Sequence, residues 1–168
     1  MSIIGKLKQS IESATGLPFY YDTPQTLNER LERATFPAAM LHILQSNAVS
    51  DTNGILRERL TIEILFATSN DPRPGVNALD FDGTWVEDNE LDKMKLQAFK
   101  WLLSLFRSRT LRLLTLNGTN RYYATDDVMY DAYGVNVTIE EIQGVTSCDF
   151  KEEPNAGDSE ESDENSAE

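Results

Sequence analysis

The sequence predicts an α+β domain with a mostly antiparallel sheet of four to six strands and two main helices packed on one face. Apolar residues recur at helical spacing in residues 2–15 and again in residues 89–107. Residues 55–69 instead alternate between apolar and polar side chains, as a strand does. The elements follow the order helix, strands, helix, strands, which lacks the repeated strand–helix unit of a parallel α/β sheet.

The composition fits one such domain followed by an acidic tail. The chain has 168 residues, of which 40% are hydrophobic, and a net charge of -13. Residues 151–168 hold eight acidic residues against one lysine, and they contain no aromatic or branched aliphatic residue. We therefore predict a single domain over residues 1–150 and a disordered tail over residues 151–168. The tail either keeps the chain soluble or binds a partner, in which case the protein is a small adaptor that acts through it.

The first half of the domain is expected to supply a helix and three strands. In residues 2–15 the apolar side chains share one face of a helix, and Gly16 suits the left-handed position that ends it. A short strand is expected to start at Phe19, and a buried strand is expected at about residues 38–46. The loop 47–53 should join this buried strand to the alternating strand as a hairpin.

The second half is expected to supply a long helix and further strands. The helix at 89–107 has an apolar stripe that is broad for a single sheet contact, which leaves part of it free to face another subunit. Strands at about 110–116 and 121–125 are predicted to form a hairpin, because Asn117-Gly118 between them is a favoured tight turn. A last strand alternates apolar and polar residues through Val135, Val137 and Ile139.

One short string resembles a catalytic motif. Asp80-Phe81-Asp82-Gly83-Thr84 resembles the first motif of the haloacid dehalogenase-like phosphohydrolases. The resemblance implies Asp80 as the nucleophile and Asp82 as the acid or base, with Mg²⁺ screening the phosphate. In that family the motif follows a buried strand of a parallel sheet, whereas here it follows a loop-like stretch rich in proline and glycine. We therefore favour a solvated acidic loop and predict that the protein is not an enzyme.

Other candidate chemistry is sparse. The chain has one histidine, His42, and one cysteine, Cys148. These are too few soft ligands to complete a transition-metal site. We expect His42 to be a structural residue inside an apolar strand and Cys148 to be an inert thiol. No catalytic residue, cofactor or metal is predicted. No apolar run approaches about 18 residues, so we expect no membrane partner.

Interface residues can be proposed from side-chain type. Four arginines are expected to form one basic cluster around the end of the second helix and the hairpin that follows it: Arg107, Arg109, Arg112 and Arg121. Their positive charge suits the negative end of the helix dipole and ion pairs with another subunit. Contact with the phosphates of a nucleic acid is the alternative. Trp85 in the long connection and Trp101 on the helix are the candidate aromatic anchors. A core position is the alternative for each, and for Trp101 it is the favoured interpretation.

The order and lengths of the elements resemble those of the tail-terminator or tail-completion proteins of tailed bacteriophages. The likeness covers about residues 3–150, in the segments IIGKLKQSIESATG, PAAMLHIL, RERLTIEILFAT, DKMKLQAFKWLLSLF and YDAYGVNVTIEEI. Members of that family are small α+β domains that form a ring, usually hexameric, which caps the tail tube below the head. Head–tail connector proteins have a similar pattern, and the acidic tail lies outside the resemblance.

This resemblance implies a homo-oligomer without catalytic activity. Its location would be the virion tail or neck, after assembly in the host bacterial cytoplasm. Its partners would be the tail tube and the head-completion or neck proteins. DNA that passes through the lumen of the ring is a further candidate partner.

Overall fold

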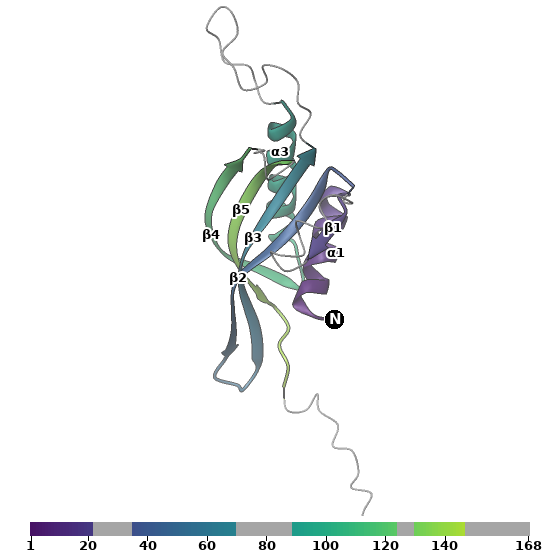
Figure 1. Cartoon of the computed structure of the whole chain (residues 1–168). Coiled ribbons are helices and arrows are strands. Elements are labelled where there is room, and N and C mark those ends of the chain that lie inside the picture. The colour runs from purple at the N-terminus through teal and green to yellow at the C-terminus, as the bar shows by residue number, and fades with distance from the viewer. Residues whose placement is uncertain (22–34, 70–88, 124–129, 147–168) are drawn as a thin grey trace, which may run out of the picture.

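The computed structural model describes residues 1–21, 35–69, 89–123 and 130–146, which form an α+β fold, as predicted (Figure 1). The five described strands form one mixed sheet with the order β1-β2-β3-β5-β4. The pair β1–β2 is parallel, and the other three pairs are antiparallel. The elements are α1 (Ile3–Thr15), β1 (Phe19–Tyr21), β2 (Ala38–Ser50), β3 (Leu56–Ser69), α3 (Asn89–Leu105), β4 (Leu111–Tyr122) and β5 (Tyr130–Glu141).

Helix α1 begins and ends where the sequence predicts. At its start, the Ser2 hydroxyl accepts a hydrogen bond from the Gly5 amide at 3.2 Å. At its end, Gly16 adopts a φ of 71° and its amide donates to the Glu12 carbonyl at 2.9 Å. Glycine reaches this left-handed conformation without the steric penalty that a Cβ brings, so the predicted end of the helix is confirmed.

The two helices cover the same face of the sheet (Figure 1). Alternating residues of β3 and β5 are buried in one cluster with apolar residues of both helices. Since alternating strand residues share a face, this cluster lies on one side of the sheet. Its strand members include Leu60, Ile62, Ile64, Phe66, Val135, Val137 and Ile139, and its helix members include Ile3, Leu7, Ile11, Leu91, Met94, Ala98, Trp101, Leu102 and Leu105.

The predicted hairpin between β2 and β3 is confirmed, although its turn is shorter than the predicted loop 47–53. Strand β2 continues to Ser50. The Asp51 carboxylate then accepts hydrogen bonds from the amides of Asn53 and Ile55, and Gly54 adopts a φ of 74°. Because β5 pairs with β3 only as far as Arg59, residues 48–58 extend past the sheet as an arm (Figure 1). On this arm Leu56 forms an isolated antiparallel bridge with Val145, which follows β5.

The predicted hairpin around Asn117-Gly118 is wrong. Strand β4 runs through both residues, and both of its halves pair with β5. Neither residue has a positive φ, which the expected tight turn requires at both of its central positions. Asn117 instead donates through Nδ2 to Asn136 Oδ1 and Thr138 Oγ1 of β5, each at 3.1 Å. The register shifts between Leu116 and Gly118, so this pair of residues marks an irregularity in a long strand.

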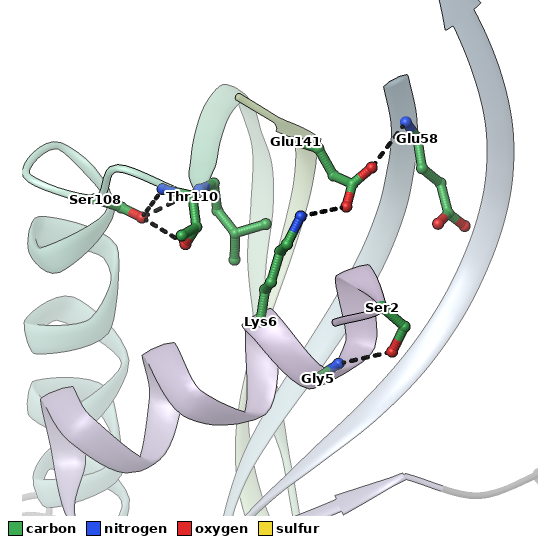
Figure 2. A network of polar contacts seen from close by, with 8 residues as sticks. Ser2, Gly5, Lys6, Glu58, Ser108, Thr110 and Glu141 are labelled. Carbon is green, nitrogen blue, oxygen red and sulfur yellow. Dashed lines mark hydrogen bonds and ion pairs between the residues drawn. The ribbon is translucent and has the colours of Figure 1, made fainter. Parts of the chain in front are cut away.

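A partly buried polar network holds α1 against the sheet (Figure 2). Lys6 Nζ donates to Glu141 Oε1 at 2.7 Å, and the Glu58 amide donates to the other carboxylate oxygen at 3.3 Å. One carboxylate on β5 therefore connects α1 with β3. Beside it, the Ile142 amide donates to the Thr110 carbonyl at 3.0 Å, which fastens the end of β5 to the turn that follows α3.

Trp101 fixes the orientation of α3 in the core. Its side chain is 0% exposed, and its ring packs on Phe66 of β3 with 6.2 Å between ring centroids. Its Nε1 donates to Ser10 Oγ of α1 at 3.2 Å. One residue therefore contacts the sheet and the other helix, and it satisfies its own donor while doing so.

We expect Trp101→Ala to lower the free energy of unfolding by about 3–5 kcal/mol, because it leaves a cavity between three elements. The control is Lys93→Ala, which truncates an exposed side chain of the same helix outside the outer stripe. That control should change the free energy by less than about 0.5 kcal/mol. Urea denaturation at one low protein concentration measures both. Equal effects of the two substitutions would contradict the orientation of α3.

Candidate interaction surface

A line of exposed apolar residues runs along the outer side of α3. Leu96, Phe99 and Leu103 lie three and four positions apart, which places them on one side of the helix, and Phe106 follows directly after the last helical residue. Their exposed fractions are 57% for Leu96, 39% for Phe99, 65% for Leu103 and 75% for Phe106. We call these four residues the outer stripe. The broad apolar pattern of the sequence is thus divided between a buried half, which includes Trp101, and an exposed half.

The outer stripe lies on the side of α3 that faces β4. The Phe99 ring meets Tyr133 of β5 edge to face, with 6.2 Å between centroids and 82° between planes. Near the start of α3, Arg121 of β4 donates to the Asp92 carboxylate at 2.8 Å. The guanidinium of Arg121 also lies 6.0 Å from the centroid of the Tyr133 ring. The part of the stripe around Phe99 therefore adjoins the β4 side of the sheet, whereas Leu103 and Phe106 line a hollow with Ala14 of α1.

Strand β4 is an edge of the sheet and has no partner on its outer side among the described residues. It has 12 residues, which corresponds to a length of roughly 40 Å. Its edge carries exposed apolar and aromatic side chains, namely Leu114, Leu116 and Tyr122, with Tyr123 directly after the strand. Unpaired backbone groups on such an edge can accept a strand from another chain.

The opposite edge of the described sheet is also largely open. Strand β1 pairs with β2 only over residues Ala39 to Leu41. No described strand pairs with the outer side of β2 from His42 to Ser50. The sheet therefore offers two edges of comparable length on its two sides.

The structure decides two questions about interface residues. Trp101 takes the core position that the sequence favoured and is not an exposed anchor, because it is fully buried. The four arginines do not form one cluster, since Arg121 lies near the start of α3 whereas Arg107 and Arg109 lie just beyond its end. Helix α3 ends at Leu105, two residues earlier than the sequence predicted. Trp85 lies outside the described residues.

The basic end of α3 includes a residue that the sequence analysis missed. Lys100 lines a hollow of about 600 Å³ together with Leu103, Phe106 and Arg107. Lys100 carries no distinctive sequence signal, because a lysine on an exposed helical face is common. Only the folded structure shows that Lys100 lies beside Arg107 in this hollow.

Candidate chemical groups do not converge in the described part of the chain. His42 is exposed on β2 and is not the buried structural residue that was expected. Asp80, Asp82 and Cys148 lie outside the described residues. Within residues 1–21, 35–69, 89–123 and 130–146, no group of three or more His, Cys, Asp or Glu side chains could hold a metal ion. No helix in these ranges is long and apolar enough to span a bilayer.

The far end of β4 is fastened by a short hydrogen bond. The Tyr122 hydroxyl donates to Glu63 Oε1 of β3 at 2.6 Å, across the intervening strand β5. This hydrogen bond to a carboxylate, together with burial, raises the pKa of Tyr122 above its ordinary value of 10.0. Burial, with the charge of Glu63 as a second cause, also raises the pKa of Tyr130.

We expect the free energy of unfolding to fall above pH 10 less steeply in Tyr122→Phe than in the unchanged chain. A tyrosine whose pKa is raised in the folded state contributes stability that is complete below its unfolded pKa and is lost as the pH passes the folded value. Glu63→Gln should also reduce the slope, because it removes the carboxylate responsible. Urea titrations from pH 8 to pH 11 measure the slopes, and identical slopes in all three proteins would refute the role of this contact.

Comparison with known proteins gives no family or relative from which a function could be assigned to these surfaces. The chain matches no model of a protein family, and no curated protein matches it at a significant level. Functional inference therefore depends on the surfaces described above. These are the two open strand edges, the outer stripe and the basic residues at the end of α3.

Proposed function

We propose that this protein is a structural subunit of a phage tail or neck that assembles with copies of itself into a ring. The observation that carries the proposal is the open edge of β4 beside the outer stripe of α3. A strand edge supplies backbone hydrogen bonds, and an adjoining apolar helix face supplies burial. Together they fit a protein surface of similar character better than they fit a small molecule.

The two open edges favour a head-to-tail arrangement of copies. In such an arrangement the β4 edge of one copy would pair with the β2 edge of the next. The two edges lie on opposite sides of the sheet, so each copy keeps one edge free for a further neighbour. Repetition of such a contact closes into a ring when the rotation between copies permits. A hexamer is the order that the resemblance to tail-terminator proteins implies.

The outer stripe would add the apolar part of the same contact. Stable interfaces take about 800 Å² from each partner and bury a core of large apolar side chains. Leu103 and Phe106, which are 65% and 75% exposed, are the natural centre of that core. Four large apolar residues beside a strand edge of roughly 40 Å are on the scale that such an interface needs.

The proposed ring would act without catalysis. Its partners would be the tail tube and the head-completion or neck proteins, with DNA passing through the lumen. Its location would be the virion, after assembly in the cytoplasm of the host bacterium. A subunit in this role acts through its shape and its contacts with neighbouring proteins, so it requires no cofactor.

We expect the full chain to form a discrete oligomer of about six subunits, as the resemblance implies. Leu103→Glu should shift this oligomer toward monomers, because it puts a charge at the centre of the stripe. Light scattering after size exclusion, at several protein concentrations, measures the mass.

Gln9→Glu is the matched control, since it adds the same charge at an exposed position on α1. It should leave the oligomer intact. Circular dichroism establishes that both variants are folded. A chain that is monomeric at every concentration would contradict self-assembly, and an oligomer unaffected by Leu103→Glu would place the interface elsewhere.

A further inference from the structure

A second hollow lies at the base of the arm and has a volume of about 690 Å³. We call it the arm hollow. Leu56 and Glu58 lie four and two positions before the buried Leu60 on β3, so all three point to the face of the sheet that the helices cover. The arm hollow therefore opens on the same side of the sheet as α3. The lining residues that give it its character are Ser46, Ala48, Leu56, Glu58, Glu141 and Val145.

Exposed apolar side chains form part of the arm hollow. Leu56 is 53% exposed and Val145 is 46% exposed. The amide of each donates to the carbonyl of the other, at 2.9 and 2.7 Å. Gly144 permits this close approach, since a Cβ at its position would collide with the Leu56 carbonyl oxygen. Directly opposed residues of an antiparallel pair point to the same face, so these two apolar side chains lie together.

The arm hollow also carries one carboxylate without a described cation. Glu141 is paired with Lys6 at 2.7 Å, and Arg57, which also lines the hollow, is paired with Asp51 at 3.3 Å. Glu58 forms no ion pair with any residue of the described ranges. The arm hollow therefore has one surplus negative charge beside its apolar side chains.

The end of α3 has the complementary character. Leu103 and Phe106 are 65% and 75% exposed, and Lys100 and Arg107 lie beside them. In the part of the chain that the structure describes, neither of these two cations has an ion pair. A partner surface that covers this place gains from apolar burial, and a carboxylate on that surface spares the cations an unpaired position. The arm hollow offers both features.

The two surfaces lie at the same end of the sheet, toward its opposite edges (Figure 1). The Ile142 amide, just after β5, donates to the Thr110 carbonyl in the turn after α3 at 3.0 Å. Three residues later, Val145 forms its bridge to the arm. The arm belongs to β2 and β3, whereas the turn after α3 leads into β4 at the other edge.

The directions of the strands allow neighbouring copies to bring these surfaces together. Strand β4 runs opposite to β2 within one copy, because three successive antiparallel pairs separate them. In two copies of the same orientation, the β4 edge of one and the β2 edge of the next are therefore antiparallel, which is a regular form of strand pairing. This arrangement places the end of α3 of one copy beside the arm of the next, on the same side of the joined sheet.

We propose that the end of α3 docks into the arm hollow of the next copy. The apolar pair Leu103 and Phe106 packs against the apolar side chains of the hollow, and Lys100 and Arg107 face Glu58 at the rim of the contact. The two surfaces differ and each copy carries both, so the contact is heterologous and can repeat around a ring. This inference rests on the proposed self-assembly, and it names the surface that receives the end of the outer stripe.

Two charge-reversed variants of the full chain test the contact. The first carries Lys100→Glu with Arg107→Glu, and the second carries Glu58→Lys. In each variant the facing charges of neighbouring copies become alike, so the dissociation constant of the oligomer should rise by about tenfold or more. The chain with all three substitutions should assemble again, because unlike charges then face each other. Light scattering after size exclusion measures the mass of each protein.

An equimolar mixture of the two variants distinguishes a contact between copies from one within a chain. In an alternating arrangement, the reversed α3 end of the first variant meets the reversed hollow of the second, and the two unchanged surfaces meet each other. Every contact is then complementary, so the mixture should recover the oligomer although neither variant forms it alone. A hexamer accommodates this alternation without a mismatch, and recovery also establishes that both variants are folded.

The matched control is Lys8→Glu with Lys93→Glu, which makes the same change of charge at exposed positions outside the contact. It should leave the oligomer intact. An oligomer that survives both charge-reversed variants, or one that neither the mixture nor the triple variant restores, would overturn the docking and leave self-assembly in place. Recovery in the triple variant alone would assign the charge contact to a single chain. An unchanged chain that stays monomeric at every concentration would overturn self-assembly and this contact together.

Discussion

The burial of Trp101 decides which side of α3 meets solvent. Its ring occupies the junction of α3, β3 and α1, and its indole N–H has a partner there in Ser10. A helix held by such a residue cannot rotate without opening a cavity and leaving a donor unsatisfied. Residues on the adjoining side of the helix, such as Leu103 and Phe106, are therefore kept in solvent by the packing of the core. The exposed outer stripe is a consequence of how the core is filled.

The second constraint is the long pairing of β4 with β5. It extends from Leu111 opposite Glu141 to Tyr122 opposite Ala132, and it leaves the other edge of β4 without a described neighbour. Register shifts interrupt the regular ladder on β4, and another interrupts β2 between Ile43 and Gln45. Such irregularities bend and twist an edge, so a strand of arbitrary shape fits it poorly. An edge of this kind is suited to one particular partner, and under the proposed self-assembly that partner would be the β2 edge of a further copy.

The sequence was informative where side-chain periodicity reports burial, and misleading where a local preference competed with long-range pairing. The spacing in α1 and the alternation in β3 are produced by one buried face, so both elements were predicted correctly. Asn117-Gly118 has the composition of a tight turn, but β5 offers a continuous partner to the residues on both sides of it. The pairing of 12 residues outweighs the preference of two. For Trp101 the sequence favoured the core but left an interface open, because a tryptophan on a broad apolar stripe fits both places until the rotation of the helix is known.

Charge and apolar surface meet at the end of α3. Lys100 and Arg107 line one hollow together with Leu103 and Phe106 of the outer stripe. A partner that buried these two apolar side chains would also have to leave water or place carboxylates beside the two cations, because an unpaired charge is costly to bury. Under the proposed self-assembly, the cations therefore belong at the hydrated rim of the interface, and the apolar side chains form its core.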